Sequence, residues 1–302
     1  MLQILYTIRS ERRLREQLNY NLRCRWFVGL NLDEEVWDGT VFTQNRERWL
    51  KADVARRFFQ LVVKEAQALD LMSDEHFTVD GTLMEACASL KSFQKMDEAE
   101  EEKSKTEDED PGNPRVDFQG EPRSHQTPQS TTDAEARLAR KGAGQEAKLS
   151  YRGHGLMENR NGLVADVEVR PANGTAEREA ALDMVANLPG NQPVTVGADK
   201  NYDTQDFVAK ARDRKATPHV AQNNQRRRSA IDGRTTRHPG YKMSQPKRQR
   251  VEEILGWMTV GGMRKLRPRG LELVSWMFTL GAAAYNLVGI RNLAMAIPHG
   301  NL

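Results

Sequence analysis

Cysteine is scarce in this sequence, with two residues, Cys24 and Cys87, among 302. Two thiols exclude a fold stapled by several disulfides and a zinc site made of four thiolates. Such sparse cysteine is typical of proteins that work in a reducing compartment. We therefore predict a cytoplasmic location.

Long apolar runs are nearly absent as well. Residues 1–9 lack the basic start, apolar stretch and cleavage site of a secretory signal. One run, residues 273–290, carries no charge over 18 residues and reaches the lower limit for a membrane span. Because it also contains Ser275, Thr279 and Asn286, we predict a buried core helix and no membrane association.

Opposite charges are segregated along the chain. Residues 97–110 hold nine acids and two lysines, whereas residues 222–270 hold 13 Lys or Arg and three acids. A solvated surface usually mixes the two signs, so the basic segment indicates a surface that faces a polyanion, and nucleic acid is favoured. The alternative is a charged, solvated segment without a partner.

Apolar spacing predicts helices in the first part of the chain. Hydrophobic residues recur at helical intervals through residues 2–22, and residues 53–71 place Val54, Phe58 and Leu61 on one side of another helix. We therefore expect a helical N-terminal region over residues 1–72, and the family resemblance given below implies that it binds DNA ends. Helical periodicity is under way at Met1 without an N-cap, which indicates that this region is truncated.

The middle of the chain has the composition of a flexible insertion. Residues 95–146 are rich in Pro, Ser, Thr, Gln, Gly and acids, and nearly free of apolar side chains. Such a segment cannot bury enough surface to offset the entropy lost on ordering. We predict that it interrupts a second domain, residues 73–295.

Strand and helix patterns alternate on both sides of this insertion. Strands are expected at residues 76–82, 148–158, 162–170, 193–198 and 216–221, with the second and third joined by a hairpin turn around Asn159–Gly162. Helices are expected at residues 175–188, 203–214, 246–270 and 271–293, after a basic loop at 222–240. This order predicts an α/β fold with a mixed sheet flanked by helices.

Three acidic residues stand at the ends of these elements. Asp80 ends the first strand in VDGT, Asp199 ends the fourth in GADKNYD, and Glu252 begins a helix in KRQRVEEILGW. Strand ends collect ligands in such sheets, and converging carboxylates suit hard divalent cations. Among 42 acids many such triplets exist, so a turn Asp, a capping Asp and a solvated Glu are the alternatives.

The sequence motifs around these residues are more specific than the spacing between the residues. FTVDGTLMEACASLKSF resembles the first signature of bacterial DDE transposases of the insertion sequence five family, and TVGADKNYDTQDFV resembles the second. RSAIDGRTTRHPGYKMSQPKRQRVEEILGW resembles the third. HGLMENRNGLVADVEV and YTIRSERRLREQLNYNLRCRWFVGL are similar to the family too. The resemblance runs in order through nearly the whole chain.

This resemblance implies a ribonuclease-H-like core and a DDE triad of Asp80, Asp199 and Glu252. In the family the triad holds two Mg²⁺ ions, for which Mn²⁺ can substitute. One ion activates a water or a DNA 3′-hydroxyl for in-line attack on a phosphodiester, and the other stabilises the leaving oxygen. The implied activity is cleavage and transfer of DNA strands at insertion-sequence ends.

A second aspartate stands near Asp199. Asp203 follows it by four positions, but the metal-binding aspartate of the family precedes a Gly-Tyr pair, which corresponds here to Asn201-Tyr202. This match assigns Asp199 to the triad. It leaves Asp203 as an N-cap of the helix that follows, with Thr204 as the alternative.

A second glutamate adjoins Glu252. Adjacent side chains of a helix point about 100° apart, so only one of Glu252 and Glu253 can face the site. The family has an arginine four positions before its glutamate, which matches Arg248 and favours Glu252. Glu253 is the second choice.

Arginines of the basic segment are expected to contact DNA. The candidates are Arg226, Arg227, Arg228, Arg234, Arg237 and Arg248. Phosphate contacts make affinity salt dependent and carry no base sequence. The resemblance implies terminal inverted repeats and target DNA as partners, with residues 42–49 as a possible reader of the repeats. It also implies a homodimer on DNA and a bacterial, nucleoid-associated protein.

The chain departs from the family near its glutamate helix. Trp257-Met258 is followed directly by Thr259, where family members carry a lysine. The missing residue rotates the rest of a continuous helix by about 100°, which a loop near Gly261 would absorb. Asn201 stands where glycine or alanine is usual. Two functions therefore remain: an active metal-dependent transposase, and a catalytically inactive truncated relic that retains DNA binding.

Overall fold

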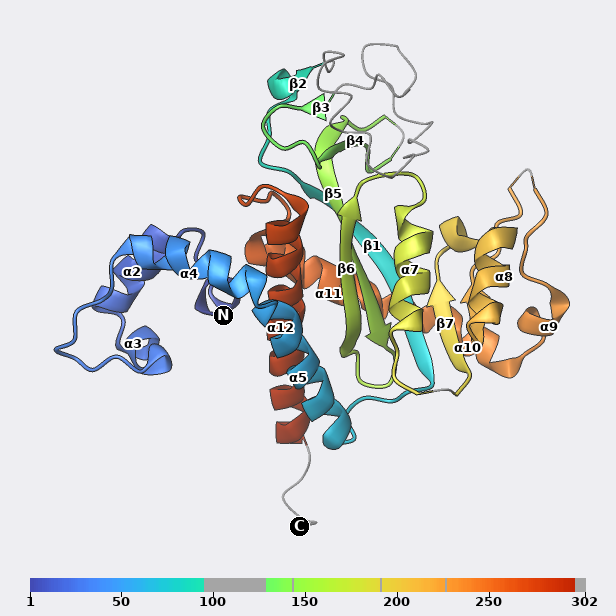
Figure 1. Ribbon diagram of the computed structural model, residues 1–302. Coiled ribbons are helices and arrows are strands. Elements are labelled where there is room, and N and C mark those ends of the chain that lie inside the picture. The colour runs from blue at the N-terminus through green and yellow to red at the C-terminus, as the bar shows by residue number, and fades with distance from the viewer. Residues whose placement is uncertain (95–128, 143, 191, 226, 297–302) are drawn as a thin grey trace.

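A mixed six-stranded sheet forms the centre of the molecule (Figure 1). The structure is a computed structural model that describes residues 1–94, 129–142, 144–190, 192–225 and 227–296. The strand order is β4-β5-β1-β7-β8, and β6 also pairs with β5. The strands are β1 His76–Glu85, β4 Arg137–Ala139, β5 Lys148–Glu158, β6 Val164–Pro171, β7 Val194–Ala198 and β8 Ala216–Val220.

Strand direction changes across the sheet. β5 runs antiparallel to β1, β4 and β6, whereas β7 runs parallel to β1 and β8. β5 and β6 form the predicted hairpin. Its turn is fixed by the buried carboxylate of Glu158, which accepts the backbone N–H groups of Arg160 and Asn161. The mixed α/β sheet predicted from the order of the elements is confirmed.

The sheet separates two hydrophobic cores because alternate side chains of a strand point to opposite faces. Phe77 and Val79 of β1 face one core, which contains apolar residues of α7 Ala176–Ala186 and α8 Gln205–Asp213. Met84 of the same strand faces the other core, which contains residues of α5 Val54–Ala68, α11 Arg250–Met258 and α12 Leu271–Ala296. Helices therefore cover both faces.

The long apolar run forms α12, which packs against α5 and β6. Length and composition alone would allow this helix to cross a membrane, but Val274 and Phe278 lie in the core. Gly153 of β5 makes room for Phe278, since a Cβ at that position would lie 2.6 Å from the ring. Buried Asn286 bonds both the backbone N–H and the C=O of Val164 at 2.8 Å. α12 is thus a core helix, as predicted.

Four short helices form an arm beside the core, drawn in blue at the left of Figure 1. They are α1 Leu2–Leu5, α2 Glu11–Tyr20, α3 Leu22–Val28 and α4 Gly39–Lys51. Leu14, Leu18 and Cys24 belong to a small core of the arm itself. Asp53, with a φ of 48°, separates α4 from α5. The helical content expected for residues 1–72 is present, and the domain limits stay predictions.

The segment expected to be a flexible insertion contains ordered structure. Residues 95–128 lie outside the described residues, but Gln129–Ser130 form β3, which pairs with β2 Phe93–Gln94 after a 3-10 turn at Leu90–Ser92. β4 pairs with β5 in the main sheet, and Leu138 is buried there. For residues 129–142 and 144–146 the expectation was therefore wrong. The strands that pair with these segments, β2 and β5, lie outside the expected insertion. Pairing with them compensates for the small number of apolar side chains in the segments themselves.

The basic segment and the helix expected after it are divided into shorter pieces. α9 Gly233–Thr236 and α10 Pro239–Lys247 precede α11, and a π-helical turn, Thr259–Met263, follows it. Pro239 suits the first turn of α10, where its missing N–H costs nothing. Gly262 has a φ of 100° and ends the helical path. α11 therefore does not run on into α12.

Candidate active site

Asp80 and Asp199 hold equivalent positions on neighbouring parallel strands. β1 and β7 pair from His76–Thr195 to Thr78–Gly197. Continuing this register by two residues along both strands places Asp80 level with Asp199. Parallel neighbours lie about 5 Å apart, so the pairing alone brings the two backbones together at this level. Asp199 directly follows β7, whereas Asp80 lies inside β1 and pairs there with Gly155 of β5, so the expectation that Asp80 ends its strand was wrong.

Backbone groups next to each aspartate orient it. The Oδ1 of Asp80 accepts the N–H of Gly81 at 2.7 Å. Asp199 caps the 3-10 turn Lys200–Tyr202 by accepting the N–H of Asn201. Asn201 is not among the described residues with positive φ, so the backbone does not require the glycine that is usual at its position.

Asp80 lies in a field of negative charge. Burial, as the largest cause, and the charges of Asp199 and Glu252 together raise the pKa of its carboxyl to about 6, against the lowering effects of the Gly81 N–H and Arg152. The charges of the other two predicted triad members therefore both act on Asp80. An ionised trio is unfavourable unless a cation compensates it.

The two adjacent glutamates of α11 have different neighbours. Both are exposed. The charge of Glu252 acts on Asp80, whereas that of Glu253 acts on Tyr285 of α12, whose pKa is raised mainly by burial. The helix thus directs Glu252 toward the strand ends and Glu253 toward α12, as the angle between adjacent helical side chains requires.

Arg250 anchors the start of α11 against the sheet. Its Nη1 donates to the carbonyls of Asn159 and Arg160, both at 3.0 Å, in the β5–β6 turn. That turn is itself organised by the carboxylate of Glu158. This link could not be predicted from the sequence. Glu158, Asn159 and Arg160 belong to the hairpin pattern, and nothing in that pattern indicates a contact with α11. The position of Glu252 depends on this link.

The carboxylate oxygens of Asp80, Asp199 and Glu252 are suited to a hard cation, although in this structure they stand too far apart to enclose one. Three ionised carboxylates supply the oxygen ligands that Mg²⁺ and Mn²⁺ prefer. Within the described ranges, however, no group of three or more His, Cys, Asp or Glu side chains stands close enough to enclose a metal ion. The chemistry of the site fits divalent metal, and the repulsion on Asp80 is the physical reason that it does.

One buried and one half-buried side chain that the sequence did not single out as functional lie near the aspartates. Tyr202 is 1% exposed, and its hydroxyl has no hydrogen-bond partner among the described residues. Burial, Asp80 and Asp199 raise its pKa, so the phenol stays neutral. Arg152 of β5 forms an ion pair with Glu177 of α7 and is influenced by both Asp80 and Tyr202. It places one positive charge beside the carboxylates.

Asp203 is not the helix cap that the sequence predicted. Thr204 caps α8 by accepting the N–H of Phe207 at 3.3 Å. The carboxylate of Asp203 is 1% exposed and instead accepts the N–H groups of Asn223 at 2.6 Å and Ala230 at 2.8 Å. Asp203, which directly follows Tyr202, therefore holds the basic loop at two points, Asn223 and Ala230.

The predicted DNA-contact arginines are placed differently from one another. Arg226 lies outside the described residues. Arg227 is exposed, and its Nη2 donates to the backbone carbonyl of Asp203 at 2.7 Å, the residue whose carboxylate holds the same loop. Arg228 is also exposed. Arg234 pairs with Asp232 at 3.0 Å, and Arg237 donates to the carbonyl of Gly233 at 2.8 Å.

Arg248 differs from the other arginines of this group. Arg248 is half-buried and packs beside Gly197. A Cβ added at Gly197 would lie 3.7 Å from the Cβ of Arg248. Its Nε is buried without a hydrogen-bond partner in the described part of the chain. The side chain thus lies against β7 near the triad.

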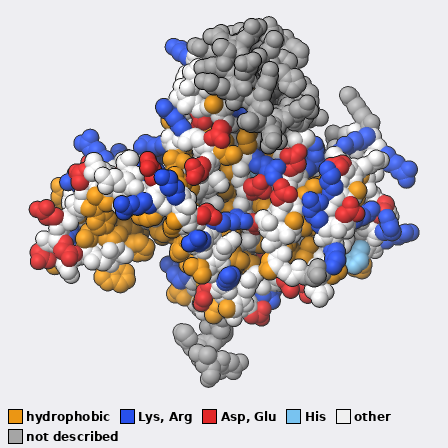
Figure 2. Space-filling model, in the orientation of Figure 1, with side chains coloured by type: hydrophobic (Ala, Val, Ile, Leu, Met, Phe, Trp, Pro, Cys, Tyr) orange, Lys and Arg blue, Asp and Glu red, His pale blue; other side chains and the backbone are white. Residues whose placement is uncertain are grey.

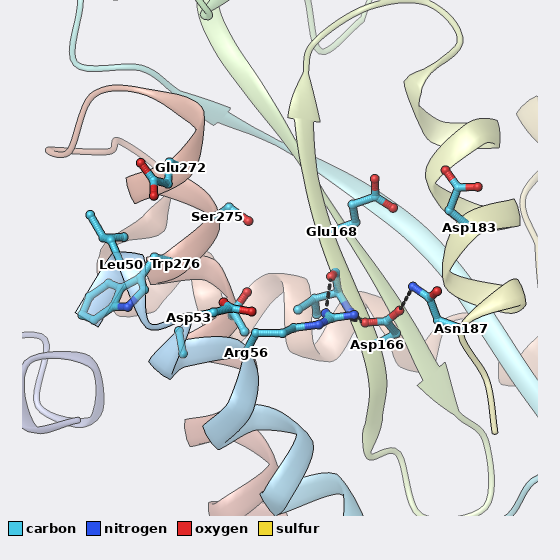
Figure 3. A pocket seen from close by; sticks show the side chains of 13 residues that line it. Leu50, Asp53, Arg56, Asp166, Glu168, Asp183, Asn187, Glu272, Ser275 and Trp276 are labelled. Atoms are coloured by element: carbon cyan, nitrogen blue, oxygen red, sulfur yellow. Dashed lines mark hydrogen bonds and ion pairs between the residues drawn. The ribbon is translucent and has the colours of Figure 1, made fainter. Parts of the chain in front are cut away.

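A pocket of about 520 Å³ lies away from these carboxylates, where α5 and α12 meet β6 and α7 (Figure 3). Arg56 of α5 crosses it to reach Asp166 at 2.7 Å and the carbonyl of Val167 at 3.1 Å. Asn187 donates to the other oxygen of Asp166 at 3.1 Å. These contacts fasten α5 to the sheet, so the pocket is a structural junction.

Replacing Asp203 tests its role as the loop anchor. In Asp203→Ala two buried N–H groups lose their acceptor, at a cost of about 1–3 kcal/mol each. We expect lower stability in urea and faster hydrogen exchange at Asn223 and Ala230. The matched control, Asp206→Ala, removes an exposed surface pair with Lys210 and changes stability by less than about 0.5 kcal/mol. Equal effects of the two changes would contradict the anchor.

The raised pKa of Asp80 makes stability depend on pH. The folded carboxyl titrates near 6 against a reference of 3.8, so it stabilises the fold below pH 3.8, and this contribution is lost as pH rises through 6. Without metal, the free energy of unfolding of Asp80→Asn, relative to that of the natural protein, should therefore rise by on the order of 2–3 kcal/mol from acid to neutral pH. Urea unfolding across this range measures the difference. Parallel curves would contradict the assignment.

Comparison with known proteins agrees with the geometry. Residues 72–287 match the family described as Transposase DDE domain, and residues 1–48 match Transposase domain (DUF772). No curated protein matches the chain.

Solved structures similar to the chain include a pre-cleavage Mos1 transpososome and the Mos1 strand transfer complex, each 8% identical with a TM-score of 0.24. They cover 94% of this chain and 78% and 77% of theirs. The Mos1 mariner paired end complex with Mn is 10% identical at the same TM-score and covers 94% and 78%. So low a score carries no argument about the fold. The ribonuclease-H-like assignment rests on the strand order and on the family, and the match over residues 72–287 shows that the chain belongs to the transposase DDE domain family.

Proposed function

We propose that this DDE-type DNA transposase cuts DNA strands and joins them to new sites by in-line attack on phosphodiesters at the ends of an insertion sequence. The observation that carries the proposal is the shared register of Asp80 and Asp199 on β1 and β7, with the charge of Glu252 acting on the same point. DDE transposases depend on metal.

Asp80, Asp199 and Glu252 are the proposed ligands of two Mg²⁺ ions, for which Mn²⁺ substitutes. When bound, the ions supply an activated oxygen nucleophile and a stabilised leaving oxygen. The protein contributes the positions: the strand pairing for the two aspartates, and the Arg250 anchor for α11. Tyr202 and Arg152 exclude water from the side of the α7–α8 core.

DNA is the proposed partner of the basic loop. Asp203 holds this loop beside the aspartates, and Arg227, Arg228, Arg234 and Arg237 are exposed on it or just after it. Phosphates bound there would lie near the reacting bond. Arg248, which packs against β7, is proposed to support the glutamate segment and the phosphate next to it. Arg226 is proposed as a further contact on the loop.

Several finer assignments belong to the same proposal. The DNA partners are the terminal inverted repeats and a target duplex, residues 42–49 read the repeats, and two copies of the chain act together. The chain belongs to the insertion sequence five group and works in the bacterial cytoplasm at the nucleoid, without a membrane partner. The signatures quoted above support this group.

The enzyme is favoured over the inactive relic. All three carboxylates of the proposed triad are present, and the charges of Asp199 and Glu252 both act on Asp80. The residue missing after Met258 falls at the π-helical turn, and Gly262 then redirects the chain. The change in rotation is absorbed there, so Met258, which is buried in the core, and α11 before it keep their packing.

Replacing one triad member tests the activity. In Asp199→Asn a neutral amide replaces an ionised metal ligand, so strand cleavage on a DNA carrying the element's ends should fall by several kcal/mol of transition-state stabilisation, or more than about 100-fold. Salt-dependent DNA binding should remain. The matched control is Glu253→Gln, which removes the adjacent charge beside Tyr285 and should keep most of the activity. Undiminished cleavage by Asp199→Asn would overturn the triad.

A further inference from the structure

The N-terminal arm exposes large apolar side chains close together. Figure 2 shows hydrophobic atoms gathered over the lower part of the arm. The exposed fractions are 86% for Tyr20, 62% for Leu22, 82% for Trp26, 51% for Phe27 and 79% for Leu32. Elsewhere in the described chain, exposed large apolar residues are spread over different elements, from Leu61 on α5 to Met243 on α10.

Helix geometry places these side chains on one face of α3. Leu22 and Trp26 are four residues apart and stack on the helix surface, with Phe27 beside them. Cys24 and Arg25 occupy the opposite side and are buried in the arm. The apolar face therefore points outward because the inward face is already filled.

This face is held in a fixed shape. Buried Arg25 donates from its Nη1 to the carbonyl of Leu18 at 3.2 Å and from its Nη2 to that of Glu34 at 2.6 Å. It also donates from its Nε to Asn31 at 3.1 Å, which ties the following loop to α3. Asn21 caps the helix by accepting the N–H of Arg23 at 3.0 Å. A preordered surface loses little entropy when it binds.

The size of the face fits a protein interface. Each aromatic side chain buries about 150–250 Å². Three aromatic and two leucine side chains therefore exceed the several hundred Å² of apolar patch that single soluble proteins usually expose. They approach the roughly 800 Å² per partner of a standard interface.

The charges around the face identify the partner. Exposed Arg23 stands in the first turn of α3, and exposed Arg12 and Arg13 stand at the start of α2, where Arg12 pairs with Glu16, whereas exposed Asp33, Glu34 and Glu35 follow the end of α3. A two-fold interface brings the same patch together in opposite orientation, so that each basic side meets the acidic side of the other copy. DNA, in contrast, would meet three acidic side chains at the rim.

We propose that a second copy of this chain docks on the exposed face of α3, with Trp26, Phe27 and Leu22 at the centre of the interface. This inference rests in part on the proposed function, since it locates the association of two copies proposed there. It requires neither DNA nor metal, so it can fail while the transposase assignment stands.

Sedimentation velocity of the full chain without DNA, over a range of micromolar concentrations, tests the proposal. The natural protein should associate to a dimer. Trp26→Ser removes a central aromatic residue and should weaken the dimer at least about 30-fold. Leu22→Glu should act in the same direction, and an acid in the first turn of α3 is compatible with the helix. Far-UV circular dichroism verifies that both variants are folded.

The matched control is Leu61→Glu on α5. Leu61 is 63% exposed, nearly the same fraction as Leu22, but it lies outside the arm. This variant should form the dimer as the natural chain does. A natural protein that stays monomeric throughout, as it would if another segment or protein covered α3, overturns the proposal. So does a dimer that is unchanged in both Trp26→Ser and Leu22→Glu.

Discussion

The repulsion between two aspartates held level on parallel strands is the constraint on which the rest of the site depends. The register of β1 and β7 fixes Asp80 beside Asp199; burial is the main cost of charging Asp80, and the charge of Asp199 adds to it. A protein gains nothing in stability from this arrangement. The arrangement becomes favourable when a divalent cation binds between the carboxylates together with the phosphates of DNA. The fold therefore favours binding of its reactants at this point.

The surroundings of the aspartates serve to keep that arrangement in place. Arg250 ties the glutamate helix to the β5–β6 turn, and Glu158 fixes the turn from within. Arg152 offsets part of the negative charge, while Asp203 holds the basic loop close by. Apart from the contacts of Glu158 within its own turn, these contacts join residues far apart in the chain. The active site is therefore a property of the whole sheet and its connections.

Much of this could be predicted from the sequence, because the elements that position the triad carry strong local patterns. The hairpin turn, the alternating strand before Asp80 and the apolar strand before Asp199 are each visible within about ten residues. The role of Asp203 could not be predicted, because its partners Asn223 and Ala230 lie 20 and 27 residues further on. A position just before a helix looks like a cap until the loop is seen.

The same reason explains the ordered part of the insertion. β4 has three residues and a composition that favours disorder, and it exists because β5 offers it an edge to pair with. Likewise, the sequence left Glu252 and Glu253 distinguishable only through the family's arginine. Their different neighbours, Asp80 and Tyr285, depend on how α11 lies between the sheet and α12.

The central claim is that Asp80, Asp199 and Glu252 together hold divalent metal. The most direct test is to titrate Mg²⁺, and then Mn²⁺, into the purified chain and into Asp199→Ala while following the melting temperature. Ligands that bind only the folded state stabilise it by about 2.7 kcal/mol at one hundred times their dissociation constant. The account predicts a rise in the natural chain that is much smaller in the variant. An equal rise in both, or none in either, would contradict it.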